Sequence, residues 1–190
     1  MFILVLGSFP STVSAAALAR PSNNLGTEGY WPFDEGAGTI VSDMSGMNND
    51  GELVGGPTWV SGKYSKAGSF DGTQEMTIQG GKALTTNATI SGWFYWRSGA
   101  TSLMRDHTSS NGWVFIWNSG GNITTRLAGV SFGTGIGVDP YLNKWTHYTV
   151  TKSGADVAVY LNGVLVYTGT GAGNTASVLP WHVMKNGATS

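Results

Sequence analysis

Residues 145–167 constrain the fold of this chain more than any other segment, because they predict three consecutive β-strands joined by tight turns. Their sequence, WTHYTVTKSGADVAVYLNGVLVY, places two alternating β-runs around a polar turn at 152–156, and a third run follows Asn162-Gly163. Asn-Gly between β-branched runs favours a type I′ turn, since both central residues of that turn must accept a positive φ. The segment predicts antiparallel sheet and favours an extracellular β-sandwich over a catalyst.

The composition supports a single all-β domain. The chain has 190 residues, 41% of them hydrophobic, and only 11% charged, about half the share usual in soluble domains. Twenty-nine glycines supply turns, and 12% aromatic residues supply bulk for a core. Ten Lys and Arg are scattered among eleven Asp and Glu, so there is no basic stripe to neutralise phosphates. The charge balance argues against nucleic acid as a partner.

Residues 1–19 are expected to be a secretion signal. They form an apolar run that ends in Ala17-Leu18-Ala19, the A-x-A pattern of a signal-peptidase site, although no Lys or Arg precedes the run. A buried N-terminal strand or helix is the alternative. Residues 20–28 would be a linker and 29–190 the domain. No other segment approaches the ~18 apolar residues of a membrane helix, so we expect a secreted or cell-surface protein without a membrane span.

Short β-prone runs alternate with Gly- and Asn-containing turns every eight to twelve residues, a spacing typical of sandwiches and barrels. The predicted strands are 29–34, 39–41, 52–54, 58–60, 67–70, 76–78, 88–96, 102–105, 113–117, 123–128, 145–151, 157–162 and 164–168. In strand 88–96, Phe94 and Trp96 share one face, and Trp93 and Tyr95 share the other. Such a strand lies in the middle of a sheet, with the second sheet on one side and either a covering loop or a ligand on the other.

Four stretches carry a family resemblance. YWPFDEGAGTIVSDMSGMNNDGEL, WVSGKYSKAGSFDG, ATISGWFYW and WTHYTVTKSGADVAVYLNGVLVYTGTG follow one another in the order and spacing of laminin-G-like domains. Residues 29–171 therefore resemble these domains of the concanavalin A-like lectin and glucanase superfamily. The resemblance implies a jelly-roll sandwich of two curved antiparallel sheets, used in secreted or surface proteins to bind carbohydrate or to mediate adhesion.

The end of the chain departs from this pattern. Family members close with a strand that carries an Asp before an Arg-Ile-Tyr-like run, whereas this sequence ends in VMKNGATS. We therefore expect a C-terminally truncated domain that lacks its final strand. The loss of that strand would expose a sheet edge beside the first strand.

The carboxylates do not form a recognisable catalytic pair. A glycoside hydrolase needs two carboxylates about 5–10 Å apart across the sugar. The glutamates are Glu28, Glu35, Glu52 and Glu75, and no E-x-D-x-x-E run is present. Asp34 and Glu35 are adjacent, so on a strand they would point to opposite faces. We predict no enzyme and no catalytic residue, and a hydrolase that uses Glu35 is the weaker alternative.

The three histidines, His107, His147 and His182, carry no catalytic motif, because no nucleophile elbow and no H-E-x-x-H is present. The resemblance implies a structural role for His147. His107 and His182 are expected in loops.

Calcium is the cofactor that the resemblance implies, held in the family by loops together with an Asp of the final strand. Hard cations take oxygen ligands from such loops, and two acidic segments offer them. The candidate metal ligands are Asp34, Glu35, Asp43, Asn48 and Asp50. Ordinary turn chemistry of Asp and Asn explains the same residues equally well, so both interpretations stay open.

A sugar site would combine flat aromatic rings with a few polar groups that bond hydroxyls. The candidate ligand-binding residues are Trp93, Tyr95, Arg105, Asp106, Trp113, Trp117, Asn118 and Arg126. Burial in the core is the competing role for each. We therefore expect a non-catalytic module whose partner is a glycan or a cell-surface protein, and a structural spacer of a larger surface protein is the alternative.

Overall fold

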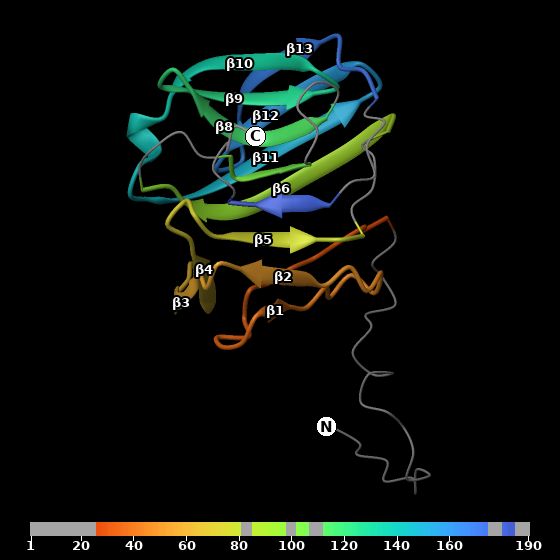
Figure 1. Ribbon diagram of the computed structural model, residues 1–190. Coiled ribbons are helices and arrows are strands. Elements are labelled where there is room, and N and C mark those ends of the chain that lie inside the picture. The colour runs from red at the N-terminus through yellow and green to blue at the C-terminus, as the bar shows by residue number, and fades with distance from the viewer. Residues whose placement is uncertain (1–25, 81–84, 98–101, 107–111, 175–179, 185–190) are drawn as a thin grey trace, which may run out of the picture.

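Two antiparallel sheets stack into a sandwich in the computed structural model, which describes residues 26–80, 85–97, 102–106, 112–174 and 180–184 (Figure 1). Within these residues the only helical element is the short 3-10 helix η2 (Asp139–Tyr141), and no helix is long and apolar enough to cross a membrane. The predicted all-β jelly-roll class is confirmed. The predicted signal peptide lies outside the described residues and stays a prediction.

The larger sheet has eight strands in the spatial order β1-β2-β5-β14-β7-β8-β9-β10. Their bounds are β1 Ile40–Val41, β2 Gly51–Val54, β5 Glu75–Ile78, β14 Trp181–Val183, β7 Met104–Asp106, β8 Trp113–Ser119, β9 Asn122–Leu127 and β10 Val130–Gly137. All neighbouring pairs are antiparallel. The last described strand, β14, therefore lies in the middle of this sheet, between β5 and β7.

The smaller sheet has four strands in the order β13-β12-β11-β6, and it lies behind β8, β9 and β10 in Figure 1. Its strands are β6 Asn87–Tyr95, β11 Trp145–Ser153, β12 Asp156–Leu161 and β13 Val164–Thr170. Among the described residues β6 is therefore an edge strand, and the prediction that strand 88–96 lies in the middle of a sheet is wrong. A separate hairpin pairs β3 Thr58–Ser61 with β4 Lys66–Ser69. Asn162 and Gly163 have φ values of 51° and 80°, as the predicted I′ turn between β12 and β13 requires.

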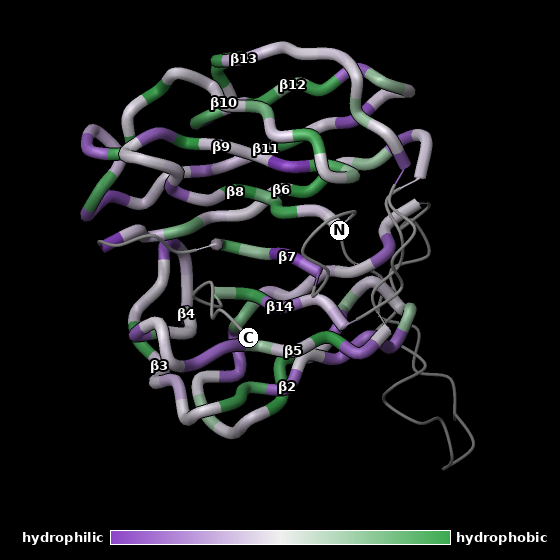
Figure 2. Tube along the Cα trace, turned by 45° about the horizontal axis from the view of Figure 1, so that its top comes forward, coloured by the Kyte–Doolittle hydropathy of each residue, from purple (hydrophilic) through white to green (hydrophobic). Residues whose placement is uncertain are grey.

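The core fills the space between the two sheets. Hydrophobic and hydrophilic residues alternate along the strands (Figure 2), so that each strand directs one set of side chains inwards. Phe115 of the larger sheet and Tyr148, Val150 and Val159 of the smaller one are all at most 5% exposed. We call the opposite side of each sheet, which points away from this core, its outer face.

Most predicted strands are present with shifts of one or two residues, but three differences are larger. Residues 29–34 form no strand, because the chain turns at Phe33 (φ 59°) and the N–H of Tyr30 bonds the Asp43 side chain instead of a sheet partner. Of predicted strand 102–105, Ser102 makes only an isolated bridge to Trp117. Strands β10 and β14 were not predicted. The short strand β1 pairs only with β2, so it forms one edge of the larger sheet.

Candidate functional site

The predicted ligand residues fall in three parts of the sandwich instead of one. Arg105, Trp117 and Arg126 belong to the outer face of the larger sheet, whereas Trp93 and Tyr95 belong to the outer face of the smaller sheet. A third group lies inside the fold or in a turn. The two outer faces lie on opposite sides of the sandwich, so their residues cannot contact the same sugar unit.

Register aligns side chains across the outer face of the larger sheet. Thr77 of β5 pairs with His182 of β14, His182 pairs with Arg105 of β7, and Arg105 pairs with Val114 of β8, which pairs with Arg126 of β9. Paired residues point to the same side of a sheet, so these side chains form one row. At ~4.8 Å per strand spacing, the row is about 19 Å long from Thr77 to Arg126.

A hydrogen-bonded pair of side chains holds the β5–β14 end of this row. Glu75, two residues before Thr77 and on the same face, places Oε2 2.7 Å from Nδ1 of His182. Both side chains are largely buried, at 17% and 7% exposure, so the carboxylate and the imidazole are held in place. We call Glu75, His182, Arg105 and Arg126 the charged row.

The two arginines bring positive charge to this face. Burial lowers the pKa of Arg105, and Arg126 lowers it further, whereas Glu75 and Asp106 act in the opposite direction. A guanidinium remains protonated despite such a shift. Arg105 Nε is buried and has no hydrogen-bond partner within the described part of the chain. The row therefore places the directional N–H donors of two guanidinium groups near one fixed carboxylate.

A β-bulge in β8 decides which tryptophan belongs to this face. Trp113 is paired with Leu127, and Trp117 with Thr124, and the register shifts by one between Val114 and Trp117. A one-residue shift moves a side chain to the other face. Trp117 therefore shares the face of Arg126, while Trp113 points into the core, fully buried and 5.2 Å from the ring of Trp181.

Three expected ligand residues serve the fold in this structure. Trp113 is 0% exposed, so its ring packs in the core, and this burial argues against the expected contact with a ligand. Asp106 is 2% exposed, and its Oδ1 accepts the backbone N–H of Trp113. Oδ1 of Asn118 accepts the N–H of Gly121 and so closes the turn between β8 and β9.

The candidate calcium ligands serve as hydrogen-bond acceptors within their own loop. Asp43 accepts backbone N–H groups from Tyr30 and Ser45 at Oδ1 and from Asn49 at Oδ2, at 2.9–3.0 Å. Burial alone would raise the pKa of Asp43, but hydrogen bonds from Ser45, Tyr30 and Asn49 outweigh it and lower that pKa. Asp50 accepts the N–H of Asp43 at 2.8 Å.

The remaining candidates do not complete a metal site. Oε1 of Glu35 accepts the N–H of Ser42, Asp34 is exposed, and Asn48 is exposed with a positive φ of 59°. Among the described residues no group of three His, Cys, Asp or Glu side chains could hold a metal ion. In the described residues Asp43, Asp50 and Glu35 therefore serve hydrogen bonds within their own loop, and calcium binding stays a prediction.

Glu75 and His182 were missed as site residues from the sequence. His182 was expected in a loop, yet it is the central residue of β14, between the buried Trp181 and Val183. The signal was the apolar-polar-apolar alternation of these three residues, which is the period of a strand. No local pattern pairs residues 75 and 182, because they are 107 positions apart.

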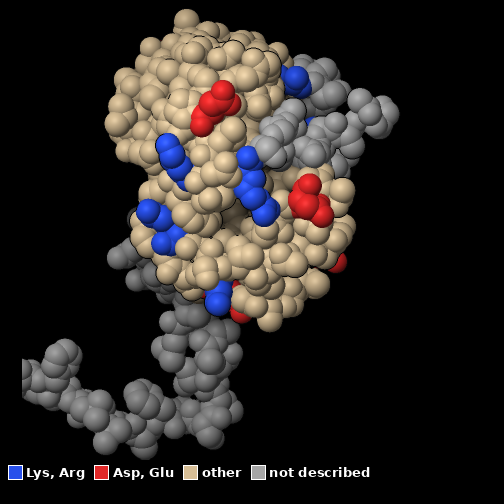
Figure 3. Space-filling view, turned by 90° about the vertical axis from the view of Figure 1, so that its left-hand side faces the viewer, with Lys and Arg blue, Asp and Glu red and all other residues tan. Residues whose placement is uncertain are grey.

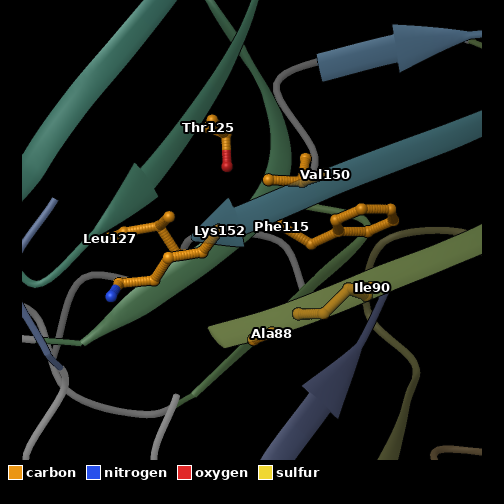
Figure 4. A pocket seen from close by; sticks show the side chains of 7 residues that line it. All are labelled: Ala88, Ile90, Phe115, Thr125, Leu127, Val150 and Lys152. Atoms are coloured by element: carbon orange, nitrogen blue, oxygen red, sulfur yellow. The ribbon is translucent and has the colours of Figure 1, made fainter. Parts of the chain in front are cut away.

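The void that the described residues enclose between the sheets is too small for a sugar. Its void of about 10 Å³ is lined by side chains that converge from β6, β8, β9 and β11 (Figure 4). Such a volume accommodates about one water molecule. On the side of the molecule seen in Figure 3, basic and acidic side chains are dispersed over a mostly uncharged surface. In the described part of the chain the outer faces of the two sheets are therefore the candidate sites.

Comparisons with known proteins agree with this fold. The family model described as the concanavalin A-like lectin/glucanases superfamily matches residues 70–184. Domain 4 of AbnA, a GH43 extracellular arabinanase from Geobacillus stearothermophilus, in complex with arabinotriose, superposes with a TM-score of 0.64 at 18% identity, over 76% of this chain and 78% of that one. At this identity the likeness shows the fold alone.

Two further solved structures are similar at lower scores. The carbohydrate-binding module CBM66 from Bacillus subtilis has a TM-score of 0.41 at 16% identity, over 71% of this chain and 88% of that chain. The β-glucanase of Bacillus licheniformis has a TM-score of 0.40 at 13% identity, over 85% and 78% of the two chains. No curated protein matched this chain.

Proposed function

This chain belongs to the concanavalin A-like lectin/glucanases superfamily, and from that premise we propose that it is a secreted or cell-surface module that binds carbohydrate without cleaving it. The superfamily contains both binding and hydrolytic proteins, so the site has to decide between them. The observation that carries the proposal is the charged row on the outer face of the larger sheet.

The row provides the groups that sugar recognition needs. The guanidinium groups of Arg105 and Arg126 donate hydrogen bonds in a fixed fork. The carboxylate of Glu75, held by His182, accepts hydrogen bonds from sugar hydroxyls. Trp117, on the same face, adds apolar surface beside them. A few placed polar groups next to an aromatic ring are typical of small-ligand sites. The arabinanase domain named above was solved with arabinotriose, which also supports a sugar ligand for this fold.

A glycoside hydrolase is the second candidate. Glu52 of β2 pairs with Thr77, so it lies diagonally from Glu75 on the same outer face, at about 7–8 Å between backbones. Glu35, the carboxylate expected to serve a hydrolase, accepts a hydrogen bond in its own loop. We favour binding over hydrolysis because the carboxylate of Glu75 is hydrogen-bonded to His182, and because Glu52 on β2 is exposed to solvent.

A glycan array with the purified full chain tests the proposal, together with the variants Arg126→Ala and Trp117→Ala. Both variants should lose binding of the charged glycans on the array while their thermal midpoints stay close to that of the parent. Arg97→Ala is the matched control, since Arg97 is exposed and bonds Ser69 and Phe70, and it should bind normally. A blank across neutral and acidic glycans would overturn the proposal in favour of a structural spacer. Reducing-sugar release that disappears in Glu75→Gln would instead establish the hydrolase.

A further inference from the structure

The outer face of the smaller sheet ends in a cluster of aromatic rings. His147 of β11 pairs with Trp93 of β6, and Trp145 pairs with Tyr95. The ring centroids are 5.2 Å apart in the first pair and 5.6 Å in the second. Tyr64, from the turn between β3 and β4, packs edge-on against Trp93 at 5.9 Å. We call these five residues the aromatic end.

These rings are accessible. Tyr64 is 81% exposed and Tyr95 41%, while Trp93, Trp145 and His147 are half-buried. Lys63 reaches over one of them, with its Nζ 4.9 Å from the centroid of Trp93. Large aromatic side chains that gather on a surface in this way mark interaction sites more often than isolated exposed ones do.

Beyond the aromatic end the same face is lined by hydroxyl groups. Thr89 of β6 pairs with Thr151 of β11, Thr151 pairs with Ala158 of β12, and Ala158 pairs with Thr168 of β13. This row borders a shallow groove of about 540 Å³. The groove is lined by Thr151, Ser153, Asp156, Val157, Ala158, Thr168, Gly169 and Thr170.

This face is nearly uncharged. The outward side chains of β6 and β11 are Asn87, Thr89, Ser91, Trp93, Tyr95, Trp145, His147, Thr149, Thr151 and Ser153. They include no carboxylate, no lysine and no arginine, and the groove adds only Asp156. The charged row, on the opposite side of the sandwich, carries two arginines and a glutamate. The two faces therefore match ligands of different charge.

We propose that the outer face of the smaller sheet is a second carbohydrate-binding surface, which takes an extended neutral polysaccharide. The apolar face of a sugar ring stacks on the aromatic end, and hydroxyl groups further along the chain exchange hydrogen bonds with the threonines. From Tyr95 to Asn87 the strand β6 is eight steps long, or about 27 Å, which accommodates several sugar units. This inference rests on the proposed carbohydrate function but not on the charged row.

The lack of charge on this face favours a neutral polysaccharide over an acidic polysaccharide or a protein. An acidic polysaccharide would need cations along its length, and among the described outward residues only Lys63 approaches the aromatic end. A second protein would bury a continuous apolar patch, whereas hydroxyl side chains cover most of this face away from the rings. Neutral sugar, with apolar ring faces and many hydroxyls, complements both parts of the surface.

Affinity electrophoresis of the full chain in gels with neutral polysaccharides (arabinan, xylan, hydroxyethyl cellulose) or acidic ones (alginate, polygalacturonate) tests the proposal. Tyr95→Ala and Tyr64→Ala should each weaken retardation by neutral polysaccharide about ten-fold. Both side chains are exposed enough to be removed without loss of folding, and Trp145→Ala provides a stronger perturbation. Tyr30→Ala is the matched control, since Tyr30 is 55% exposed outside this face, and it should behave as the parent.

The outcomes separate this inference from the proposed function. Retention of neutral-polysaccharide binding in Arg126→Ala, with loss in Tyr95→Ala, supports two surfaces. Binding in the parent that Tyr95→Ala and Tyr64→Ala leave unchanged overturns the second surface and leaves the charged row intact. Binding of acidic polysaccharides alone also overturns it. A dimer in sedimentation that Tyr95→Ala converts to monomer would assign the face to self-association and likewise overturn the proposal.

Discussion

Replacing Asp43 with alanine is expected to lower the free energy of unfolding by about 2–4 kcal/mol, because one carboxylate satisfies three backbone donors. The N–H groups of Tyr30 and Ser45 bond Oδ1, and that of Asn49 bonds Oδ2. A hydrogen bond to a charged group contributes about 1.5–3 kcal/mol when its donor is cut off from water. The bond from Ser45 is buried, and those from Tyr30 and Asn49 are partly buried. The Ser45 bond should therefore contribute its full value, and the other two only a fraction of theirs.

The pH dependence of this effect follows from the pKa. Asp43 has a folded-state pKa below 3.8 despite the opposing effect of burial. A lowered carboxylate pKa contributes stability that is present above the unfolded-state pKa and is lost as the pH falls through the folded-state pKa. The stability difference between the parent and Asp43→Ala should therefore be constant near neutral pH and shrink below about pH 4.

Urea unfolding of the parent, Asp43→Ala and Asp34→Ala between pH 7 and pH 3 measures both effects. Asp34 is exposed, so its replacement removes the same charge and should change stability by less than about 0.5 kcal/mol. The reasoning is refuted by an Asp43→Ala variant as stable as the control, or by a difference that does not depend on pH. A destabilisation that appears only when calcium is present would instead identify Asp43 as a metal ligand, since a native-state ligand raises stability by mass action.

Two further substitutions test local features of the fold. Gly163→Ala should lower the free energy of unfolding by about 1–2 kcal/mol, because Gly163 has φ 80° in the β12–β13 turn. Gly133→Ala is the control: it has open space around the added Cβ, and it should change stability by less than about 0.5 kcal/mol. Equal midpoints of the two variants in chemical unfolding would contradict the turn assignment. Lys152→Met should lower the free energy of unfolding by about 2 kcal/mol, because the Nζ of the buried Lys152 donates hydrogen bonds to Thr86 O, Gly154 O and Asn174 Oδ1. A thermal midpoint equal to or above that of the parent would show that the fold does not need this buried charge.

The strands that sequence analysis found have local signals, and the strands it missed do not. Asn162-Gly163 determines its turn through the φ values that only a few residues accept, so β12 and β13 were predictable. Strand β10 contains three glycines, which lower β-propensity. Strand β14 has only three residues, so its alternation is a weak signal, and its place between β5 and β7 depends on pairing with residues far away in the sequence.

The candidate site shows the same division between local and non-local information. Arg105, Trp117 and Arg126 were chosen for their chemistry, and the structure brings them to one face. Trp113 was chosen on the same grounds and lies in the core. In a straight strand Trp113 and Trp117 would share a face, and the bulge between them reverses that relation. No residue type in β8 indicates the bulge, so the sequence alone could not show that the two tryptophans lie on different faces.

The two outer faces have a further consequence for binding. Stacked sheets are about 10 Å apart, and the core between them is filled, so one straight glycan chain cannot contact both faces at once. Arg126 and Tyr95 lie on different sheets, on opposite sides of this core, and substitutions at well-separated sites add in free energy. Binding losses from Arg126→Ala and Tyr95→Ala should therefore be independent, each confined to its own class of polysaccharide. A module with two such faces would bind two polysaccharide chains at once instead of one. Its affinity for a matrix of neutral and charged polysaccharides would then depend on how closely the two kinds of chain lie together.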